Sequence, residues 1–228
     1  FRMKPAFKQI TWLGYPGTTG LKAIDYKFTD SFTDPLGKSD KYYTEKLYRI
    51  ENSFICYKNR SNVNIANIKP FENNKYITFG SFNNISKITK TNLETWITIL
   101  HKIPNSQLVL KSHHYNSEKW VSEFITFFEN NGILSGRVRL LPYIKSKHGH
   151  LTMYNMIDIS LDTFPFNGAT TTMESLWMGV PVITLTGERH ASRVGTSILK
   201  NLKLSSLISG NVNEYIDLAV DISKNKNL

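Results

Sequence analysis

The sequence of 228 residues contains one cysteine, Cys56, so it cannot form an internal disulfide bond. It has no cluster of cysteine and histidine at the spacing of a structural zinc site. No apolar run approaches the roughly 18 residues of a membrane-spanning helix, and there is no apolar core of a signal peptide. These absences exclude the disulfide-rich, zinc-finger and membrane-spanning classes, and we expect a cytoplasmic protein.

The charge is unbalanced, with 28 lysines and arginines against 18 aspartates and glutamates, a net charge of +10. A basic surface attracts nucleic acids, acidic proteins and phosphate ligands. However, the basic residues are dispersed, and they neither form one stripe nor interleave with aromatic residues. We therefore expect a solvated basic surface, and neither nucleic acid nor a membrane as partner.

Hydrophobic residues make up 40% of the chain and charged residues 20%, which is typical of a globular protein. The length allows one large domain or two small ones, each with a proper core. The sequence begins at Phe1 without an initiator methionine, so we expect it to be one part of a longer polypeptide.

The first 65 residues are predicted to form short strands at 9–13, 23–28 and 47–50, joined by turns. Residues 59–70 contain four asparagines and few large side chains, which is typical of a linker. We therefore place a domain boundary in this segment.

From residue 76 onward, strand-like and helix-like patterns alternate. Thr91-x-x-Glu94 is predicted to be the capping box of the first helix, and Gly132 the end of the second. This alternation indicates an α/β fold, a parallel sheet with helices on both faces. The expected strands are residues 76–80, 108–110, 137–141, 157–161 and 181–185.

Three loops that follow these strands carry polar side chains. Ligands of parallel sheets bind at the carboxyl ends of the strands, so we expect these loops to converge. Together they offer cations, imidazoles, hydroxyls and a helix N-terminus, which suits a nucleotide diphosphate. The residues are Asn83, Asn84 and Lys87 in the first loop, Lys145, Lys147, His148 and His150 in the second, and residues 167–174 in the third.

The third loop belongs to a strand–turn–helix unit that spans residues 167–181. Its helix is expected to bury Met173, Leu176 and Trp177, and its N-terminus has bare amides and three threonine hydroxyls, which favour a phosphate. Glu174 follows one turn later, within reach of the hydroxyls of a sugar on that phosphate. An ordinary capped turn is the alternative interpretation.

Two further groups receive structural interpretations. Adjacent His113 and His114 invite a metal site, but neighbours on a strand point to opposite faces, so we expect no metal. Asp162 ends a strand beside the third loop, and we expect it to fix that loop and not to act as a base.

Several ordered motifs carry a resemblance to a known family. They read WLGYPGTTG at 12–20, IDY at 24–26 with TD at 29–30, FNNISKI at 82–88, and a long block from 158 to 193. With these motifs the sequence resembles the O-linked N-acetylglucosamine transferase family, which includes SPINDLY-like proteins. The blocks have the family's order and extend over nearly the whole chain.

The resemblance implies a GT-B architecture, in which two Rossmann-like domains face each other across a cleft. Residues 1–65 would be the C-terminal remnant of the first, acceptor-side domain, which is incomplete here. Residues 66–228 would be the nucleotide-sugar-binding domain. Family members carry tetratricopeptide repeats upstream, and no repeat of roughly 34 residues occurs in this sequence, so we expect repeats and the missing half-domain in the full-length protein.

The resemblance also implies roles for residues of the first two loops and for a loop of the first domain. Lys87 matches the lysine that contacts the diphosphate and stabilises the departing nucleotide, because that step leaves negative charge on a phosphate oxygen. Asn83 and Asn84 precede it, with Asn84 in place of a frequent glutamine. Lys147 and His150 match positions at the nucleotide base. Gly14 and Pro16 match a loop of the first domain that lies close to the sugar.

In the third loop, Thr170 and Thr171 match the pair whose hydroxyls and amides hold the pyrophosphate. Glu174 matches an acidic residue that binds the ribose hydroxyls, where the animal enzyme has aspartate. Ala169 departs from the animal enzyme's histidine, which removes one donor to the phosphate.

These correspondences predict a glycosyltransferase fragment that needs neither a metal nor another cofactor. Its donor would be a nucleotide sugar, with UDP-N-acetylglucosamine (UDP-GlcNAc) expected and GDP-fucose or UDP-glucose as alternatives. Its acceptor would be serine or threonine of a protein. The competing hypothesis is a non-catalytic remnant that binds a nucleotide or a partner, since half of the cleft is missing.

Overall fold

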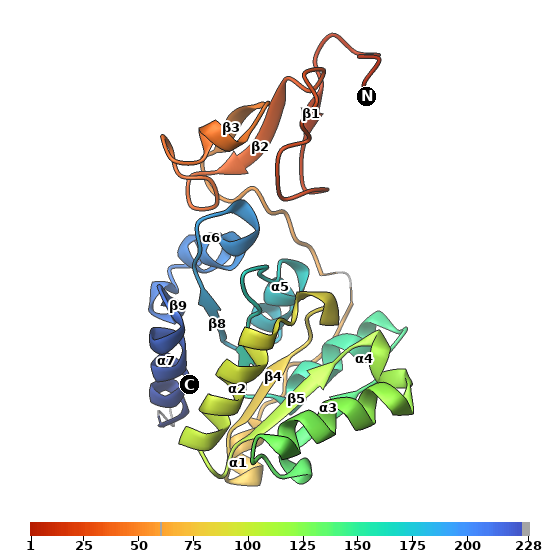
Figure 1. Cartoon of the computed structure of the whole chain (residues 1–228), viewed down its shortest axis with the longest axis vertical. Coiled ribbons are helices and arrows are strands. Elements are labelled where there is room, and N and C mark those ends of the chain that lie inside the picture. Colours follow the sequence, from red (N-terminus) through yellow and green to blue (C-terminus); the bar gives the residue numbers. More distant parts are fainter. Residues whose placement is uncertain (60, 225–228) are drawn as a thin grey trace.

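The computed structural model describes residues 1–59 and 61–224, and it contains two parallel β-sheets (Figure 1). The smaller sheet has the strand order β1-β2-β3, and the larger one has the order β6-β5-β4-β7-β8-β9. Every strand pair is parallel, and for the larger sheet the alternation of strands and helices after residue 76 predicted this. The strands are β1 (Ile10–Thr11), β2 (Tyr26–Asp30), β3 (Lys46–Ile50), β4 (Thr78–Ser81), β5 (Gln107–Lys111), β6 (Val138–Leu141), β7 (Ile159–Leu161), β8 (Val182–Leu185) and β9 (Ile208–Ser209).

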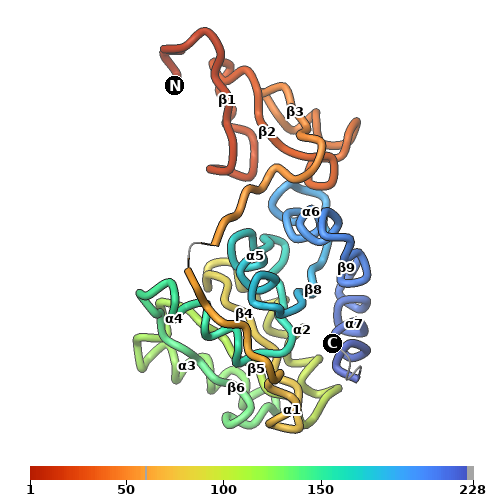
Figure 2. The backbone as a smooth tube through the Cα atoms, turned by 180° about the vertical axis from the view of Figure 1, so that it is seen from behind, coloured from red at the N-terminus to blue at the C-terminus, as the bar shows by residue number. Residues whose placement is uncertain are grey.

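Seven α-helices accompany these strands within the described residues. The first is a single short turn, and the others follow the strands of the larger sheet (Figures 1 and 2). The helices are α1 (Pro70–Asn74), α2 (Lys90–Lys102), α3 (Glu118–Asn130), α4 (Lys147–Thr152), α5 (Thr170–Trp177), α6 (Val194–Asn201) and α7 (Val212–Lys224).

Strand β5 shows that both faces of the larger sheet are covered. Leu108 and Leu110 belong to an apolar cluster with side chains of α2, α3 and α7. Val109, which lies between them, belongs to a separate cluster that includes Leu151 of α4 and Met178 after α5. Because successive side chains of a strand point to opposite faces, the two clusters lie on the two sides of the sheet. The expected arrangement of helices on both faces is confirmed.

Of two predicted helix ends, one is wrong and one is correct. The capping box of α2 was predicted at Thr91 and Glu94, but it is formed by Thr89 and Asn92, so that prediction is wrong. The Asn92 amide donates to Thr89 Oγ1 at 3.2 Å, and the Thr89 amide donates to Asn92 Oδ1 at 3.1 Å. Gly132, at φ +77°, follows the last turn of α3 and ends it as predicted.

Two other details of the sequence interpretation are corrected. Trp177 was assigned to the apolar face of α5, but it is 50% exposed, and only Met173 and Leu176 of that face pack on the cluster around α6. His113 and His114 were expected on a strand, but they lie in a 3-10 turn directly after β5.

Residues 1–59, which contain the smaller sheet, form the smaller part of the molecule, and residues 61–224 form the larger part. Buried hydrogen bonds join the two parts. Asp30 Oδ2, at the end of β2, accepts from Ser197 Oγ of α6 at 2.5 Å and from the Phe54 amide at 3.1 Å. Arg193 Nε donates to the Phe32 carbonyl at 2.9 Å. These contacts fix the smaller sheet next to α6, as Figure 1 shows.

The segment between β3 and α1 runs along the larger part (Figure 2). The Ala66 amide donates to Asn155 Oδ1 at 3.1 Å, and Asn155 Nδ2 donates to the Asn64 carbonyl at 3.1 Å. The domain ranges 1–65 and 66–228 stay a prediction, and Arg60 and residues 225–228, which they include, lie outside the described residues.

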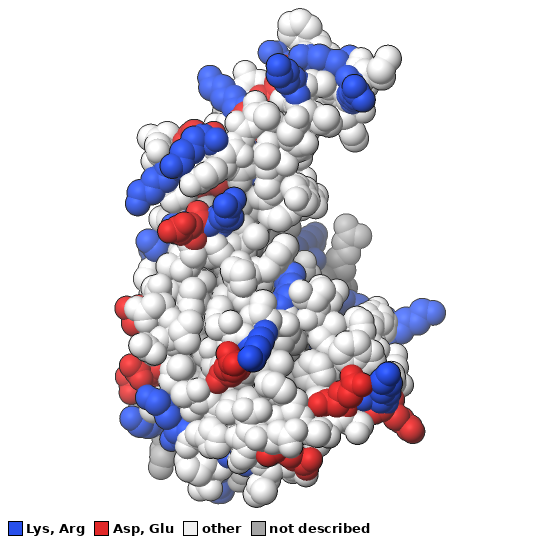
Figure 3. Space-filling view, viewed as in Figure 1, with Lys and Arg blue, Asp and Glu red and all other residues white. Residues whose placement is uncertain are grey.

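The surface has the mixed character that the sequence predicted. Figure 3 shows lysines and arginines scattered among aspartates and glutamates on one face of the molecule, with no single basic stripe there. Within residues 1–59 and 61–224, no helix combines the length and apolar character needed to cross a membrane.

Candidate functional site

The candidate site lies at the carboxyl ends of β4 and β7, which are neighbours in the larger sheet. From β4 the strand order runs one way to β5 and β6, and from β7 it runs the other way to β8 and β9. The loops that leave β4 and β7 therefore separate toward opposite sides, which opens a crevice between them. This is the place where the sequence predicted a ligand.

Asp162, the first residue after β7, holds the loop that leads to α5. It is 1% exposed, and its Oδ1 accepts from the amides of Gly168 at 2.7 Å and Thr163 at 2.9 Å. Its Oδ2 accepts from Thr184 Oγ1 at 2.7 Å. Burial raises the pKa of Asp162 to about 6, against the lowering effect of these hydrogen bonds. The contacts agree with a loop-fixing function for this carboxyl.

Gly168 is the tightest point of this loop. A Cβ atom there would lie 2.5 Å from Thr171 Oγ1, 2.8 Å from Thr172 Oγ1 and 2.9 Å from Asn83 Oδ1. Helix α5 begins at its cap residue Ala169, whose side chain caps no amide. The first amides of α5 and three hydroxyl or amide groups therefore gather where only glycine leaves room.

Lys87 and the N-terminus of α5 come together although they are about 80 residues apart in the sequence. Lys87 Nζ donates to the Asn167 carbonyl at 2.8 Å and lies 4.2 Å from the centre of the Phe166 ring. Thr171 Oγ1 donates to Asn83 Oδ1 at 2.8 Å. Burial lowers the pKa of Lys87, and the nearby Asp162 carboxyl opposes that shift. The crevice thus presents an ammonium group beside a helix N-terminus.

Glu174 lies under two basic side chains in the same crevice. Its side chain is 4% exposed and accepts from Lys147 Nζ and, at 2.7 Å, from His150 Nε2. Burial raises the pKa of this carboxyl, but the bonds from His150 and Lys147 outweigh burial and hold it below the usual value. The Lys147 side chain is 47% exposed, whereas the Glu174 side chain beneath it is buried.

His150 is fixed at both ring nitrogens. Lys111 Nζ, at the end of β5, lies 2.5 Å from His150 Nδ1, and Glu174 accepts at Nε2. Because the carboxylate can only accept, Nε2 carries the hydrogen and Nδ1 accepts from the Lys111 ammonium. Burial lowers the pKa of Lys111, opposed by Glu174. The four side chains form one continuous polar row.

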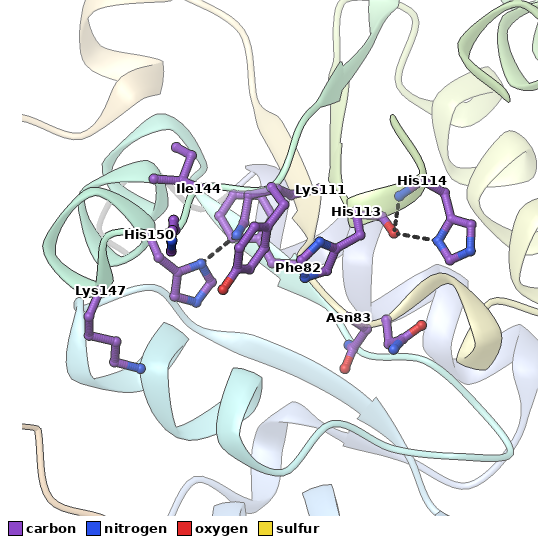
Figure 4. Close-up of a pocket in the computed structure, with 12 residues that line it drawn as sticks. Phe82, Asn83, Lys111, His113, His114, Ile144, Lys147 and His150 are labelled. Carbon is purple, nitrogen blue, oxygen red and sulfur yellow. Dashed lines mark hydrogen bonds between the residues drawn. The ribbon is translucent and has the colours of Figure 1, made fainter. Parts of the chain in front are cut away.

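This row borders a cavity of about 380 Å³, drawn in Figure 4. The figure shows Lys111 and His150 facing each other, with Lys147 beside His150 and Asn83 across the cavity. Aromatic rings form another side of it, where His113 stacks on Tyr143 with centroids 3.5 Å apart and planes 19° apart. A cavity with aromatic walls and a polar row suits a planar base joined to a sugar.

A second cavity, of about 320 Å³, lies on the other side of the N-terminus of α5. Gly14 and Pro16 of the smaller part line it together with Asn167, Ala169 and Thr170. Tyr43 OH lies 3.4 Å from the Pro16 carbonyl oxygen, beside this loop. The loop that the resemblance placed near the sugar therefore lies beside the same helix end.

All ten predicted site residues border these two cavities or bond to residues that do. Asn83, Asn84, Lys147 and His150 line the first cavity, and Gly14, Pro16 and Thr170 line the second. Lys87, Thr171 and Glu174 join them through the hydrogen bonds described above. Asn84 also bonds locally, since its Oδ1 accepts from the Ser86 amide at 3.0 Å. Their individual roles stay predictions.

Lys111 was missed by the sequence interpretation. It is 6% exposed and follows three buried apolar residues at the end of strand β5. A lysine at the carboxyl end of a buried strand is a signal that could have been used, because burial of a cation requires a partner. No three side chains of histidine, cysteine, aspartate or glutamate gather at one point in the described part of the chain.

Comparison with known proteins gives a consistent match. The model of glycosyl transferase family 41 matches residues 1–65 and 70–228. The chain is 43% identical over 220 residues to a probable UDP-N-acetylglucosamine–peptide N-acetylglucosaminyltransferase SPINDLY from Petunia hybrida, with 96% of this chain and 24% of that protein covered. It is 34% identical over 236 residues to a probable UDP-N-acetylglucosamine–peptide N-acetylglucosaminyltransferase SEC from Arabidopsis thaliana, with 99% of this chain and 24% of that protein covered. The chain spans about a quarter of the length of these relatives.

Among solved structures, a mutant of the O-GlcNAc transferase from Thermobaculum terrenum superimposes with a TM-score of 0.92 at 34% identity. The match covers 98% of this chain and 42% of that one. A trehalose-phosphate synthase from Burkholderia vietnamiensis matches with a TM-score of 0.52 at 9% identity, which shows the fold alone. The GT-B-type fold that the resemblance implied is confirmed.

Proposed function

Because the chain belongs to glycosyl transferase family 41, we propose that it provides the nucleotide-sugar site of an enzyme that glycosylates proteins. The donor would be UDP-GlcNAc and the acceptor a serine or threonine hydroxyl. One observation carries this proposal: Lys87 and the N-terminus of α5 meet in the crevice between β4 and β7. Two sources of positive potential at one point are what a diphosphate requires.

The chemistry of the crevice fits the departure of a nucleotide. When the bond between the sugar and the phosphate breaks, negative charge develops on the phosphate oxygen. The Lys87 ammonium and the first amides of α5 would stabilise that charge without a metal ion. Thr170 and Thr171 would add hydroxyl donors to the diphosphate, and Gly168 would let it approach the backbone.

The nucleoside would occupy the cavity of about 380 Å³. Its base would lie near Lys147 and His150, and the ribose hydroxyls would bond to Glu174 after Lys147 moves aside. Lys111 would hold His150 in the orientation that leaves Glu174 correctly placed. The sugar itself would face the Gly14–Pro16 loop on the other side of the α5 N-terminus.

The activity, acceptors and location of the whole protein are also proposals, because the chain spans about a quarter of its relatives. We propose a cytoplasmic, metal-independent enzyme with protein acceptors. The missing half-domain and upstream repeats would complete its cleft. GDP-fucose and UDP-glucose stay alternative donors, and a nucleotide-binding remnant without transfer stays the alternative function.

Thermal unfolding with and without nucleotide tests the proposal. At 100 times the dissociation constant, UDP should stabilise the chain by about 2.7 kcal/mol. For a domain of this size that raises the melting temperature by roughly 5–10 °C. GDP tested in parallel separates the donor classes. If neither nucleotide at millimolar concentration shifts the melting temperature, the binding site is not the one proposed.

A matched pair of lysine variants locates the effect. Lys87→Met removes the ammonium in the crevice and should abolish most of the stabilisation by UDP. Lys90→Met removes a nearby exposed lysine whose only recorded partner among the described residues is Glu94, at 3.5 Å, and should leave it unchanged. Equal responses of the two variants would contradict the role of Lys87.

A further inference from the structure

A buried aspartate–histidine pair, to which the proposed function assigns no role, borders the second cavity through its histidine. His190 Nδ1, in the turn after β8, lies 2.7 Å from Asp34 Oδ2, in the loop after β2. The side chains are 5% and 1% exposed, and the two residues are 156 positions apart in the sequence. Removing such a pair from water costs free energy unless hydrogen bonds satisfy its polar atoms, so its bonding partners indicate what it does.

Asp34 is bonded as an orienting group. Its Oδ2 also accepts from Thr29 Oγ1 at 2.5 Å, and its Oδ1 accepts from Tyr43 OH at 3.0 Å. Burial raises the pKa of Asp34, but the hydrogen bonds from His190, Thr29 and Tyr43 outweigh burial and lower it. Because the ionised carboxylate can only accept, His190 carries a hydrogen on Nδ1, and the neutral form of the ring has its lone pair on Nε2.

The Nε2 side of His190 faces open space. Among the described residues, no side chain or backbone group bonds to His190 Nε2, and the ring lines two cavities of about 680 and 320 Å³. The edge of the ring packs on Phe54, with centroids 5.0 Å apart, which fixes the ring plane. The imidazole is therefore held through Nδ1, and its Nε2 atom is available to a ligand in the cavities.

These cavities adjoin the proposed position of the sugar. Both are lined by Gly14, Pro16 and Phe166 in addition to His190. The Phe166 ring lies 4.2 Å from Lys87 Nζ. The free nitrogen of His190 thus opens into the space across Phe166 from the cation assigned to the leaving phosphate, and an acceptor hydroxyl must enter this space to reach the sugar.

We propose that His190 is the proton acceptor for the hydroxyl that receives the sugar, and that Asp34 is its positioning residue. This inference rests on the proposed function. The hydroxyl oxygen forms a bond to the anomeric carbon while the bond from that carbon to the phosphate oxygen breaks. The electron pair of the broken bond leaves with the nucleoside diphosphate, and the hydroxyl proton moves to His190 Nε2. The imidazolium that forms is stabilised by the Asp34 carboxylate.

The competing interpretation is that the pair only joins the two parts of the chain. Arg193 and Asp30 already make such joining contacts nearby, at the Phe32 carbonyl and at Ser197. A joining role predicts that loss of His190 lowers stability and nucleotide binding together. A catalytic role predicts loss of turnover in a folded protein that still binds the nucleotide.

The test uses the intact protein as its cell makes it, with UDP-GlcNAc or GDP-fucose as donor and peptides containing serine or threonine as acceptors. His190→Ala should lower kcat by about 100-fold or more, the usual contribution of a general base. Stabilisation by UDP should stay unchanged. Added imidazole should restore at least part of kcat, because it can enter the space that the side chain leaves.

Two further variants separate the structural contribution of the Asp34–His190 bond from the basicity of His190. His190→Asn keeps an amide nitrogen near the position of Nδ1, and hence the bond to Asp34, but has no basic nitrogen; it should fold normally and be as slow as His190→Ala. Asp34→Asn should lower kcat while leaving the KM for the donor unchanged.

Each outcome decides the matter. The assignment is overturned if His190→Asn keeps more than half of kcat, or if imidazole fails to rescue a folded, UDP-binding His190→Ala. Failure of the proposed function is seen separately, as an unmodified intact protein that neither UDP nor GDP stabilises, or as one that binds UDP but transfers no sugar.

Discussion

Residues 1–59 and 61–224 both form parallel sheets, but they bury different kinds of side chain. In the larger part, the core consists of large apolar residues such as Phe79, Trp96 and Phe128, each 0% exposed. In the smaller part, the buried hydrophobic residues are Ile24, Leu47 and Phe54. The other buried side chains there are polar or charged, namely Gln9, Lys27, Thr29, Asp30, Thr33, Asp34, Ser39 and Glu45.

The difference indicates two sources of stability. The larger part is stabilised by apolar burial, which is roughly proportional to the area removed from water. The smaller part exposes several of its large apolar residues, with Phe1 at 85% and Phe7 at 89%, and depends on paired polar groups and on contact with α6. The candidate site lies where these two parts meet, so its geometry depends on both.

The largest expected effect compares one substitution in the two parts. Phe79→Ala in β4 should lower the free energy of unfolding by about 3–5 kcal/mol, because it leaves a cavity in the core. Phe7→Ala, at an exposed position of the smaller part, should change it by less than about 0.5 kcal/mol. Urea unfolding followed by circular dichroism measures both. Similar losses for the two variants would show that the smaller part has an apolar core after all.

The next effect concerns added volume. Gly168→Ala should cost about 1–3 kcal/mol, because its Cβ would meet three oxygens within 2.9 Å, and it should weaken UDP binding. Gly14→Ala in the smaller part should cost little stability, because the nearest atom, the Trp12 carbonyl oxygen, lies at 3.9 Å. Thermal unfolding with and without UDP measures both quantities. If Gly168→Ala is as stable as Gly14→Ala, the loop before α5 is looser than its contacts indicate.

The free energy of unfolding should depend on pH with opposite sign at one carboxyl group of each part. Glu45, in the smaller part, accepts bonds from Thr18 and Thr19, and although burial raises its pKa, these bonds lower the pKa to about 2 from 4.5. Its contribution is complete above pH 4.5 and is lost as the pH falls toward 2. The destabilisation by Glu45→Gln should therefore shrink, by on the order of 1–2 kcal/mol, between pH 7 and pH 3.

Asp162, in the larger part, provides the opposite case. Its pKa is raised to about 6 by burial, so ionisation costs stability as the pH rises from 3.8 to 6. Asp162→Asn should remove that dependence, although it also loses bonds at every pH. Urea unfolding at several pH values measures both variants, and the same sign of pH dependence for the two sites would contradict the comparison.

The smallest effect tests the junction between the parts. Ser197→Ala removes the hydroxyl that donates to Asp30 and should lower stability by about 1 kcal/mol. Hydrogen exchange should accelerate at the β2 amides more than at those of β5. Ser223→Ala, whose hydroxyl bonds only within α7, is the control and should leave β2 exchange unchanged. Uniform acceleration in both sheets would mean that the two parts open as one unit.

Much of the fold could be predicted from the sequence, because local patterns determine it. The alternation of strands and helices follows from the spacing of apolar residues, and the carboxyl-edge loops follow from that alternation. The gathering of Asn83, Thr171 and Lys87 at one point was therefore foreseen from topology.

The rest depends on contacts that local patterns do not encode. The Thr89–Asn92 capping box competes with Thr91 and Glu94 a few residues away, and only packing of the preceding turn decides between them. Trp177 is 50% exposed although its ring contacts the partly buried ring of Tyr57, with centroids 6.2 Å apart, and this contact with a segment about 120 residues earlier is not encoded in the pattern of the helix. The Asp34–His190 pair joins positions 156 residues apart, so neither residue is marked in its own segment.

The position of β4 in the larger sheet has a consequence for how the chain is made. One edge of β4 pairs with β5, about 30 residues later, but Phe79 pairs with Ile159 on the other edge, 80 positions later. At a synthesis rate of about 5–20 residues per second, that second partner leaves the ribosome roughly 4–16 s after the first strand. During this interval the N–H and C=O groups on that edge of β4 have no partner strand. The nascent chain should therefore be prone to aggregate at this stage, well before Ser197 emerges to secure the smaller sheet.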